Sequence, residues 1–373
     1  MKPNPLLRLN ALGQSVWLDY IRRDLLTGGR LAAMMADDGL AGITSNPSIF
    51  EDAIARHDFY DTEIQQLLAA GADRDRVYQA LTFGDVTRAA DILRPLWEAT
   101  GCRDGLVSLE VSPHLADDTE ATVAEAMTLW RTLDRPNLMI KVPGTRAGLP
   151  AITRLIAADV NVNVTLLFSV ARYREVADAF MAGLEQRHSL GQSLAGIASV
   201  ASFFISRIDT QVDAELDQLS VDRLSVAQSG AIALRGTAAL ACARLAYRHY
   251  REWTSAARWQ ALAAAGAQPQ RLLWASTSTK NPAYSDVRYV EELIAPETVN
   301  TLPPATLEAY RDHGDPALRL EPGIAEAAQR IAHLAAAGID MDQVAEQLER
   351  EGVDKFIAAH DALLAVLAAR CGD

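Results

Sequence analysis

The chain has 373 residues and a formal net charge of −13, with 49% hydrophobic and 22% charged residues. These values are typical of a globular protein with ample material for a core, and the acidic balance argues against a nucleic-acid surface, which is normally basic. No stretch approaches the roughly 18 uninterrupted apolar residues that span a membrane. Residues Met1–Arg8 contain no apolar segment long enough for a signal peptide. We therefore expect a cytoplasmic protein without nucleic-acid or membrane partners.

Short apolar or β-branched runs alternate with helical stretches along the chain, which is the pattern of a parallel sheet wrapped by helices. Helical periodicity is clear over Asp118–Thr132, Leu149–Ala158, Val170–Gln186 and Ile205–Gln218. The predicted strands are Ser15–Asp19, Gly39–Ser45, Gly105–Val111, Leu138–Val142, Asn161–Thr165, Gly196–Ser202, Arg271–Ala275 and Thr298–Thr301.

These eight strands with intervening helices favour a closed α/β barrel of the (β/α)8, or TIM, type over an open sheet; such a barrel needs about 250 residues before insertions. The Ala- and Arg-rich segment 222–265 predicts two extra helices before the seventh strand. Residues 324–370 predict further helices, packed on the outside or forming a C-terminal lid. Since no linker divides the chain, we expect one domain over residues 1–373.

Lysine is scarce in this chain, because only four of its 35 basic residues are lysines. Lys141 closes the apolar run Asn137–Lys141, and Lys280 closes Leu272–Lys280. Arginine cannot replace lysine as a nucleophile, since a guanidinium stays protonated. Desolvation among apolar neighbours favours the neutral amine, which attacks carbonyls to form a Schiff base. Alternatively, the scarcity reflects a biased genome, and Lys141 extends its amine to solvent at a strand end.

Polar side chains capable of chemistry end or follow several of the predicted strands. Barrel active sites are built at the C-terminal ends of the strands, so these residues form a plausible site. Taken singly, each has a structural explanation as a capping, turn or satisfied interior residue. The residues are Asp19, Asn46, Glu110, Lys141, Asn163, Thr165, Ser202 and Ser278.

Seven segments, in the expected order over residues about 15 to 310, resemble transaldolase, a Schiff-base-forming enzyme family of the pentose phosphate pathway. The Ser-Thr-Lys-Asn version of the last segment and the chain length resemble the longer branch found in actinobacteria, cyanobacteria and plants. The segments are Val16–Asp19, Gly42–Ser48, Val107–Val111, Leu138–Pro143, Asn161–Ser169, Ala201–Arg207 and Trp274–Asn281.

The resemblance implies a role for each matching residue. Lys141 would form the Schiff base with the C2 carbonyl of a ketose phosphate, and Asp19 would remove the proton from its C4 hydroxyl. Glu110 and Thr165 match the pair that holds a proton-transferring water. Asn46 and Asn163 match the amides that bind the hydroxyls of the three-carbon unit, and the iminium serves as the electron sink, so neither metal nor cofactor is expected.

The resemblance also implies a phosphate site made of Arg207, Ser278 and Lys280, with Ser202 as a further substrate-binding residue. The shorter branch carries Arg at the Lys280 position, and lysine binds phosphate as a point charge rather than a fork. Lys280 is also the main rival of Lys141 as nucleophile, although it follows a Ser/Thr-rich segment rather than an apolar strand.

The resemblance implies transfer of dihydroxyacetone from sedoheptulose 7-phosphate to glyceraldehyde 3-phosphate, which gives erythrose 4-phosphate and fructose 6-phosphate. One alternative is a fructose 6-phosphate aldolase, whose shorter branch carries Gln at the Glu110 position and Tyr at the Phe204 position. Another is a non-catalytic sugar-phosphate-binding barrel, which would be expected to have lost Lys141 or Asp19. The expected partners are sugar phosphates, and the expected assembly is a monomer or homodimer.

Overall fold

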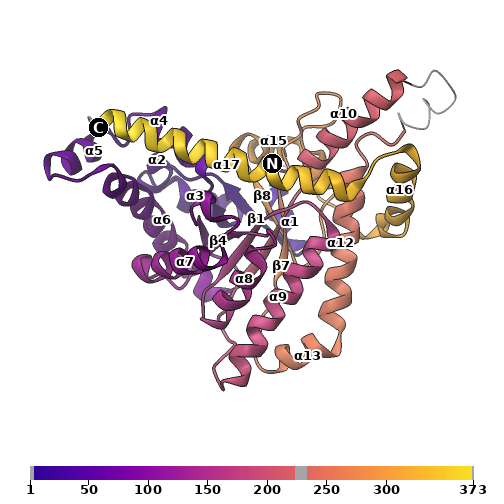
Figure 1. Cartoon of the computed structure of the whole chain (residues 1–373), viewed down its shortest axis with the longest axis horizontal. Helices are drawn as coiled ribbons and strands as arrows, with labels where there is room; N and C mark the ends of the chain where they lie inside the picture. Colours follow the sequence, from indigo (N-terminus) through magenta and orange to yellow (C-terminus); the bar gives the residue numbers. More distant parts are fainter. Residues whose placement is uncertain (1–3, 223–232, 372–373) are drawn as a thin grey trace.

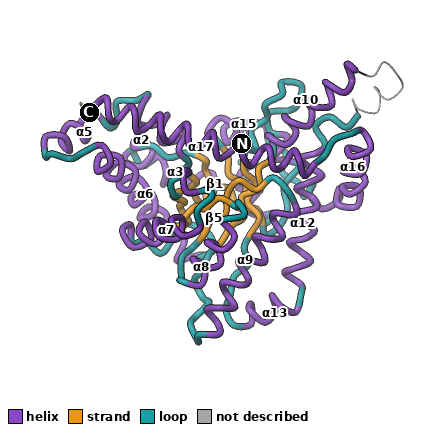
Figure 2. Tube along the Cα trace, viewed as in Figure 1, coloured by secondary structure: helices purple, strands orange, loops and turns teal. Residues whose placement is uncertain are grey.

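A closed barrel of eight parallel strands lies at the centre of the protein. The structure is a computed structural model, and it describes residues 4–222 and 233–371. Figure 2 shows the strands surrounded by helices. The predicted (β/α)8 fold is therefore confirmed. The strands are β1 Gln14–Asp19, β2 Leu40–Thr44, β3 Leu106–Glu110, β4 Leu138–Pro143, β5 Val162–Leu167, β6 Ser199–Phe204, β7 Arg271–Ala275 and β8 Thr298–Leu302.

The helices before β6 include the 26-residue α6, which the sequence patterns did not predict. The predicted helices beginning at Asp118, Leu149 and Val170 are observed as α7, α8 and α9, with ends that shift by a few residues. The helices are α1 Pro5–Ala11, α2 Arg23–Thr27, α3 Arg30–Asp38, α4 Pro47–Ala55, α5 Asp61–Ala69, α6 Arg74–Ala99, α7 Thr119–Leu133, α8 Gly148–Ala157 and α9 Val170–Ser189, with a 3₁₀ turn at Pro113–Leu115.

The helices after β6 include both predicted extra regions. Two helices, α12 and α13, fill the predicted insertion where it is described; residues 223–232 of that prediction lie outside the described residues. Two more, α16 and α17, fill residues 324–370. The helices are α10 Ser206–Asp222, α12 Ala238–Ser255, α13 Ala257–Ala264, α14 Arg288–Glu291, α15 Pro304–His313, α16 Ile324–Ala337 and α17 Met341–Cys371, with a 3₁₀ turn at Glu321–Gly323.

The strands are buried along their length, as expected where helices cover the outside and side chains fill the inside of a barrel. Three predicted strand starts, at Gly39, Gly105 and Gly196, were wrong because each falls on a glycine with a positive φ. Gly105 has φ +76°, and β3 begins at Leu106. Gly39 has φ +67° and caps the end of α3, and Gly196 has φ +86°. A left-handed residue cannot continue a β-strand, so β2 begins at Leu40 and β6 at Ser199.

The last helix, α17, crosses the molecule from α16 to the neighbourhood of α5 (Figure 1). It packs along α4 and α6 and also contacts α10 and β5. The C-terminal helices were predicted either to pack on the outside or to form a lid. Helix α17 lies like a lid, because its residues Lys355 and Phe356 line the cavity that contains Lys141. Among the described residues, no helix combines the length and apolar character needed to cross a membrane.

Candidate active site

Three of the predicted site residues lie side by side on neighbouring strands. In the β-sheet register Glu110 of β3 pairs with Lys141 of β4, and Lys141 pairs with Asn163 of β5. Thr165 lies two residues beyond Asn163 and therefore faces the same side of β5. Parallel strands in a barrel end at one mouth, so residues far apart in the sequence converge there.

Lys141 is buried, with only 5% of its surface exposed. Its Nζ donates a hydrogen bond to the Ser45 carbonyl at 3.1 Å and lies 3.8 Å from Glu110 Oε2. The same nitrogen lies 5.8 Å from the centre of the Phe356 ring, which α17 contributes. The amine therefore lies at the mouth of the barrel with a carboxyl beside it and an aromatic ring covering it.

Glu110 has an environment suited to proton transfer at neutral pH. Burial raises the pKa of Glu110 to about 7, and the Asp19 charge acts in the same direction, whereas the nearby Lys141 charge opposes the shift. Among the described residues, neither Glu110 Oε2 nor Thr165 Oγ1 has a hydrogen-bond partner, although both atoms are buried. Because buried polar atoms are nearly always hydrogen-bonded, both retain capacity to bind a small polar group.

Asp19, at the end of β1, is held by a hydroxyl chain that the sequence patterns did not single out. Thr44 Oγ1 donates to Asp19 Oδ1 at 2.8 Å, and the Thr44 and Thr301 hydroxyls lie 2.7 Å apart. Burial raises the pKa of Asp19, while the Lys141 charge and the Thr44 hydrogen bond lower it. The only signal for Thr44 and Thr301 was that each is a polar residue at a strand end.

The two predicted amides differ in position. Asn163 is fully buried inside the barrel, where it donates to Ser108 Oγ at 2.9 Å and accepts from Ser202 Oγ at 2.7 Å. Asn46 is the N-cap of α4, with its Oδ1 accepting from the Ile49 amide at 3.1 Å. Asn46 therefore has a structural role as a helix cap, and it also lines the cavity that contains Lys141.

One cavity of about 320 Å³ collects most of the predicted site residues. Glu110, Asn163 and Thr165 are not in its lining, since they lie deeper in the barrel or beside it. Lys280 lies at the open rim, and its Nζ donates to Ser278 Oγ at 2.6 Å. The predicted residues that line this cavity are Asp19, Asn46, Lys141, Ser202, Arg207, Ser278 and Lys280.

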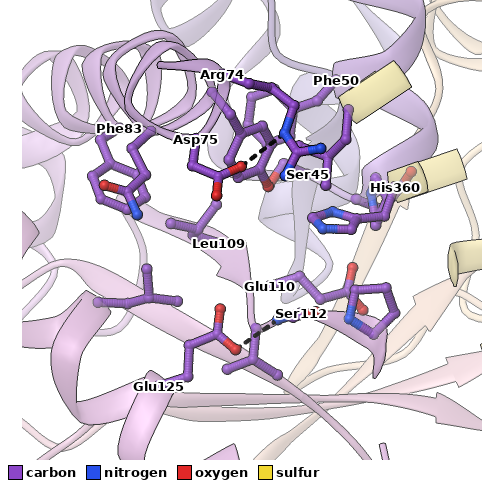
Figure 3. Close-up of a pocket in the computed structure, with 18 residues that line it drawn as sticks. Ser45, Phe50, Arg74, Asp75, Phe83, Leu109, Glu110, Ser112, Glu125 and His360 are labelled. Carbon is purple, nitrogen blue, oxygen red and sulfur yellow. Dashed lines mark hydrogen bonds and ion pairs between the residues drawn. The ribbon is translucent and has the colours of Figure 1, made fainter. Parts of the chain in front are cut away.

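A second cavity of about 290 Å³ adjoins the first, because Asn46 lines both. Figure 3 shows Glu110 at its edge, opposite Glu125 and near His360 of α17. Glu125 accepts a hydrogen bond from the Ser112 amide at 3.2 Å. Glu110 therefore lies between Lys141 on one side and this second cavity on the other.

The buried carboxyl of Glu110 is expected to destabilise the fold above neutral pH. Its folded-state pKa of about 7 exceeds its ordinary value of 4.5, so the folded state binds more protons and stability falls as pH rises from 4.5 to 7. Glu110→Gln removes this loss. We expect the free energy of unfolding of the variant to exceed that of the unchanged protein by up to about 3 kcal/mol at pH 8.

Urea unfolding at pH 5 and pH 8 measures this effect. The advantage of Glu110→Gln should be much smaller at pH 5, where Glu110 is mostly protonated in the folded protein. If the variant gained the same free energy of unfolding at both pH values, ionisation of the buried Glu110 carboxyl would not be the cause of the gain.

Comparison with known proteins agrees with this geometry. A family model described as Transaldolase/Fructose-6-phosphate aldolase matches residues 16–367. A protein named Transaldolase from Frankia alni is 49% identical over 370 residues, covering 99% of this chain and 98% of its own length. Another Transaldolase, from Saccharopolyspora erythraea, is 52% identical and covers 95% and 94% of the two chains. Transaldolase 2 of a Nostoc species is 47% identical, covering 98% and 97%. The chain therefore belongs to the transaldolase/fructose-6-phosphate aldolase family.

Proposed function

We propose that this chain is a transaldolase, which transfers a dihydroxyacetone unit from sedoheptulose 7-phosphate to glyceraldehyde 3-phosphate through a Schiff base on Lys141. The products are erythrose 4-phosphate and fructose 6-phosphate. The observation that carries the proposal is a buried lysine amine 3.8 Å from a buried carboxyl, in a cavity whose other end is lined by cations. The full-length relatives named Transaldolase support it further.

Lys141 is the proposed nucleophile, and Glu110 the acid that assists it. The amine attacks C2 of the ketose to give a carbinolamine, which loses water to form the iminium. Glu110 supplies the proton that the departing hydroxyl takes, through a water held with Thr165. A carboxyl that titrates near pH 7 can both give and take this proton at neutral pH.

Asp19 is the proposed base for carbon–carbon cleavage. It takes the proton from the C4 hydroxyl, the C4–O bond becomes a carbonyl, and the C3–C4 electron pair moves into the iminium to form an enamine. The aldose phosphate leaves. The enamine then attacks the aldehyde of the acceptor, and the steps reverse, with Asp19 returning its proton.

Asn46, Asn163 and Ser202 are proposed to bind the hydroxyls of the three-carbon unit. Asn163 and Ser202 are already joined by a hydrogen bond of 2.7 Å, which fixes both side chains. Groups held in this way lose little entropy on binding. The covering ring of Phe356, which is only 4% exposed, limits access of water to the covalent intermediate.

The main alternative is a fructose 6-phosphate aldolase, which releases dihydroxyacetone to water. Glu110 and Phe204 stand where that branch carries Gln and Tyr. Phe204 is buried, and its ring lies 5.2 Å from that of Phe168. It therefore offers no hydroxyl with which to activate a water, which favours transfer. A non-catalytic sugar-phosphate-binding barrel is disfavoured because Lys141 and Asp19 are both present and lie in one cavity.

Product analysis distinguishes these functions. With fructose 6-phosphate as donor and erythrose 4-phosphate as acceptor, the purified protein should form sedoheptulose 7-phosphate. Without an acceptor, release of free dihydroxyacetone should be slower by at least about tenfold. Equal rates of transfer and release would identify an aldolase. No turnover in the presence or absence of the acceptor would indicate a non-catalytic sugar-phosphate-binding protein.

The phosphate of the donor is proposed to bind Arg207, Ser278 and Lys280. Arg207, on α10, lies with its guanidinium 5.4 Å from the Phe204 ring centre. Arg207→Ala should weaken binding of phosphorylated donors by about 1.5–3 kcal/mol, the size of a charge-assisted hydrogen bond. We expect KM to rise at least about tenfold for fructose 6-phosphate and to change little for fructose. An equal rise for both donors would make Arg207 a structural residue.

The setting of this activity is also a proposal. We place it in the cytoplasm, where sugar phosphates are available, in a monomer or homodimer and in one domain over residues 1–373. The closed barrel supports the single domain, because its first and last strands, β1 and β8, pair with each other. Sedimentation of the purified protein would give the assembly state.

A further inference from the structure

A cluster of cations occupies one end of the main cavity, and one of its members comes from an unexpected element. Arg207 belongs to α10, just after β6, and Lys280 follows β7. Lys355 belongs to α17, far along the chain, and lines the same cavity as the other two. We propose that Lys355 is a third cation for the substrate phosphate, so that the C-terminal helix forms one wall of the phosphate site. This inference rests on the proposed function and extends it.

The three cations lie close enough to affect one another. The positive charge of Arg207, followed by burial, lowers the pKa of the Lys355 amine. Burial, and then the charges of Lys355 and Arg207, lower the pKa of the Lys280 amine. Like charges disfavour one another's protonated forms in this way. The cluster therefore carries a repulsion that a bound anion would relieve.

The cluster has little compensation from carboxylates. Within the part of the chain that the structure describes, none of the three side chains forms a salt bridge. Glu351 of α17 and Asp19 act on Arg207 only at longer range. By contrast, the surface residue Arg258 bridges Glu185 and Asp178 at 2.7 and 2.8 Å. A phosphate, with about −1.5 to −2 charges at pH 7, is the anion that suits three such cations.

Close packing fixes the position of α17 at this point. A Cβ atom added at Gly352 would lie 2.8 Å from Leu166 Cδ2 and 3.7 Å from an Arg207 guanidinium nitrogen. Gly352 therefore lets the helix approach β5 and Arg207 more closely than another residue would. Phe356, one turn later, is buried beside Lys141. The turn that carries Lys355 is thus held between these two contacts.

The arrangement gives α17 two functions in one turn. Successive residues of an α-helix point about 100° apart, so Phe356 faces Lys141 while Lys355 faces the end of the cavity that contains Arg207. A donor sugar must reach from Lys141, at its C2 carbonyl, to the cations, at its terminal phosphate. Lys355 and Phe356 would therefore recognise a donor that spans these two points.

Phosphate binding by three variants tests the inference. Lys355→Ala removes the cation, Lys355→Arg keeps it, and Arg350→Ala removes an exposed cation from the same helix but away from the cavity. Calorimetry with inorganic phosphate measures affinity without requiring turnover. We expect Lys355→Ala to raise the Kd for phosphate about fifteen- to fiftyfold, within the range of a charge-assisted contact, and the other two to leave it within about twofold.

Kinetics provides the second measurement. Lys355→Ala should raise KM for fructose 6-phosphate by a similar factor and affect kcat far less, since Lys355 is distant from the bonds that break. A phosphate Kd unchanged in Lys355→Ala, or equally raised in Arg350→Ala, would overturn the role of Lys355. Absence of transfer in the unchanged protein would refute the proposed function instead, and the calorimetric result would still decide whether Lys355 binds phosphate.

Discussion

Replacing Lys141 by alanine should abolish transfer. The variant loses the buried amine that lies 3.8 Å from the proton-transferring Glu110, so no iminium can form and the C3–C4 bond has no electron sink. We expect kcat/KM to fall by about 10⁴–10⁶-fold, as when a covalent nucleophile is removed. A coupled assay of erythrose 4-phosphate release measures it.

Lys280→Ala is the matched control for this variant, because Lys280 is the rival amine in the same cavity. Its amine lies at the exposed rim and donates to Ser278, so its loss should weaken donor binding while leaving covalent adduct formation intact. Full activity in Lys141→Ala, or loss of the adduct only in Lys280→Ala, would reverse the two roles.

Asp19→Ala should separate adduct formation from cleavage. The Schiff base should still form, because Lys141 and Glu110 remain, but the C4 hydroxyl keeps its proton and the aldose is not released. Loss of a general base costs about 10²–10⁴-fold in rate. Single-turnover experiments that follow the trapped adduct and the released aldose separately measure both steps.

Two comparison variants sharpen this test. Glu110→Gln should slow adduct formation itself, because the variant lacks the carboxyl that assists dehydration of the carbinolamine. Thr44→Val removes the hydrogen bond that lowers the pKa of Asp19, so the pKa rises and the acidic limb of the rate profile should move to higher pH. If Asp19→Ala cannot form the adduct while Glu110→Gln forms it at the normal rate, the assignment of the two carboxyls is wrong.

The barrel could be predicted from the sequence because short apolar or β-branched runs alternate with helical stretches, and several of the predicted strands end at or just before a polar residue. The same pattern located Asp19, Glu110 and Lys141, since parallel strands in a barrel end at one mouth. The pattern could not predict how deep in the barrel each of these side chains lies. Asn163 and Thr165 lie inside the barrel rather than in the cavity lining, because register and strand tilt decide which inward-facing residues reach the opening.

The contribution of α17 could not be predicted from the sequence. Helical periodicity indicates an amphipathic helix, but it does not say which element the apolar face covers. Phe356 and Lys355 lie more than 200 residues from Lys141 in sequence, and their place at the mouth depends on packing against α4, α6 and Leu166. The support of Asp19 by Thr44 and Thr301 likewise depends on pairing around the closed barrel.

Peptide mapping after borohydride reduction tests the central claim most directly. The protein is incubated with fructose 6-phosphate, reduced and digested, and the modified lysine is identified by mass spectrometry. The mechanism proposed here predicts a three-carbon adduct on the peptide that contains Lys141, formed after the aldose phosphate has left. An adduct on Lys280 or Lys355, or no adduct on any peptide, would contradict it.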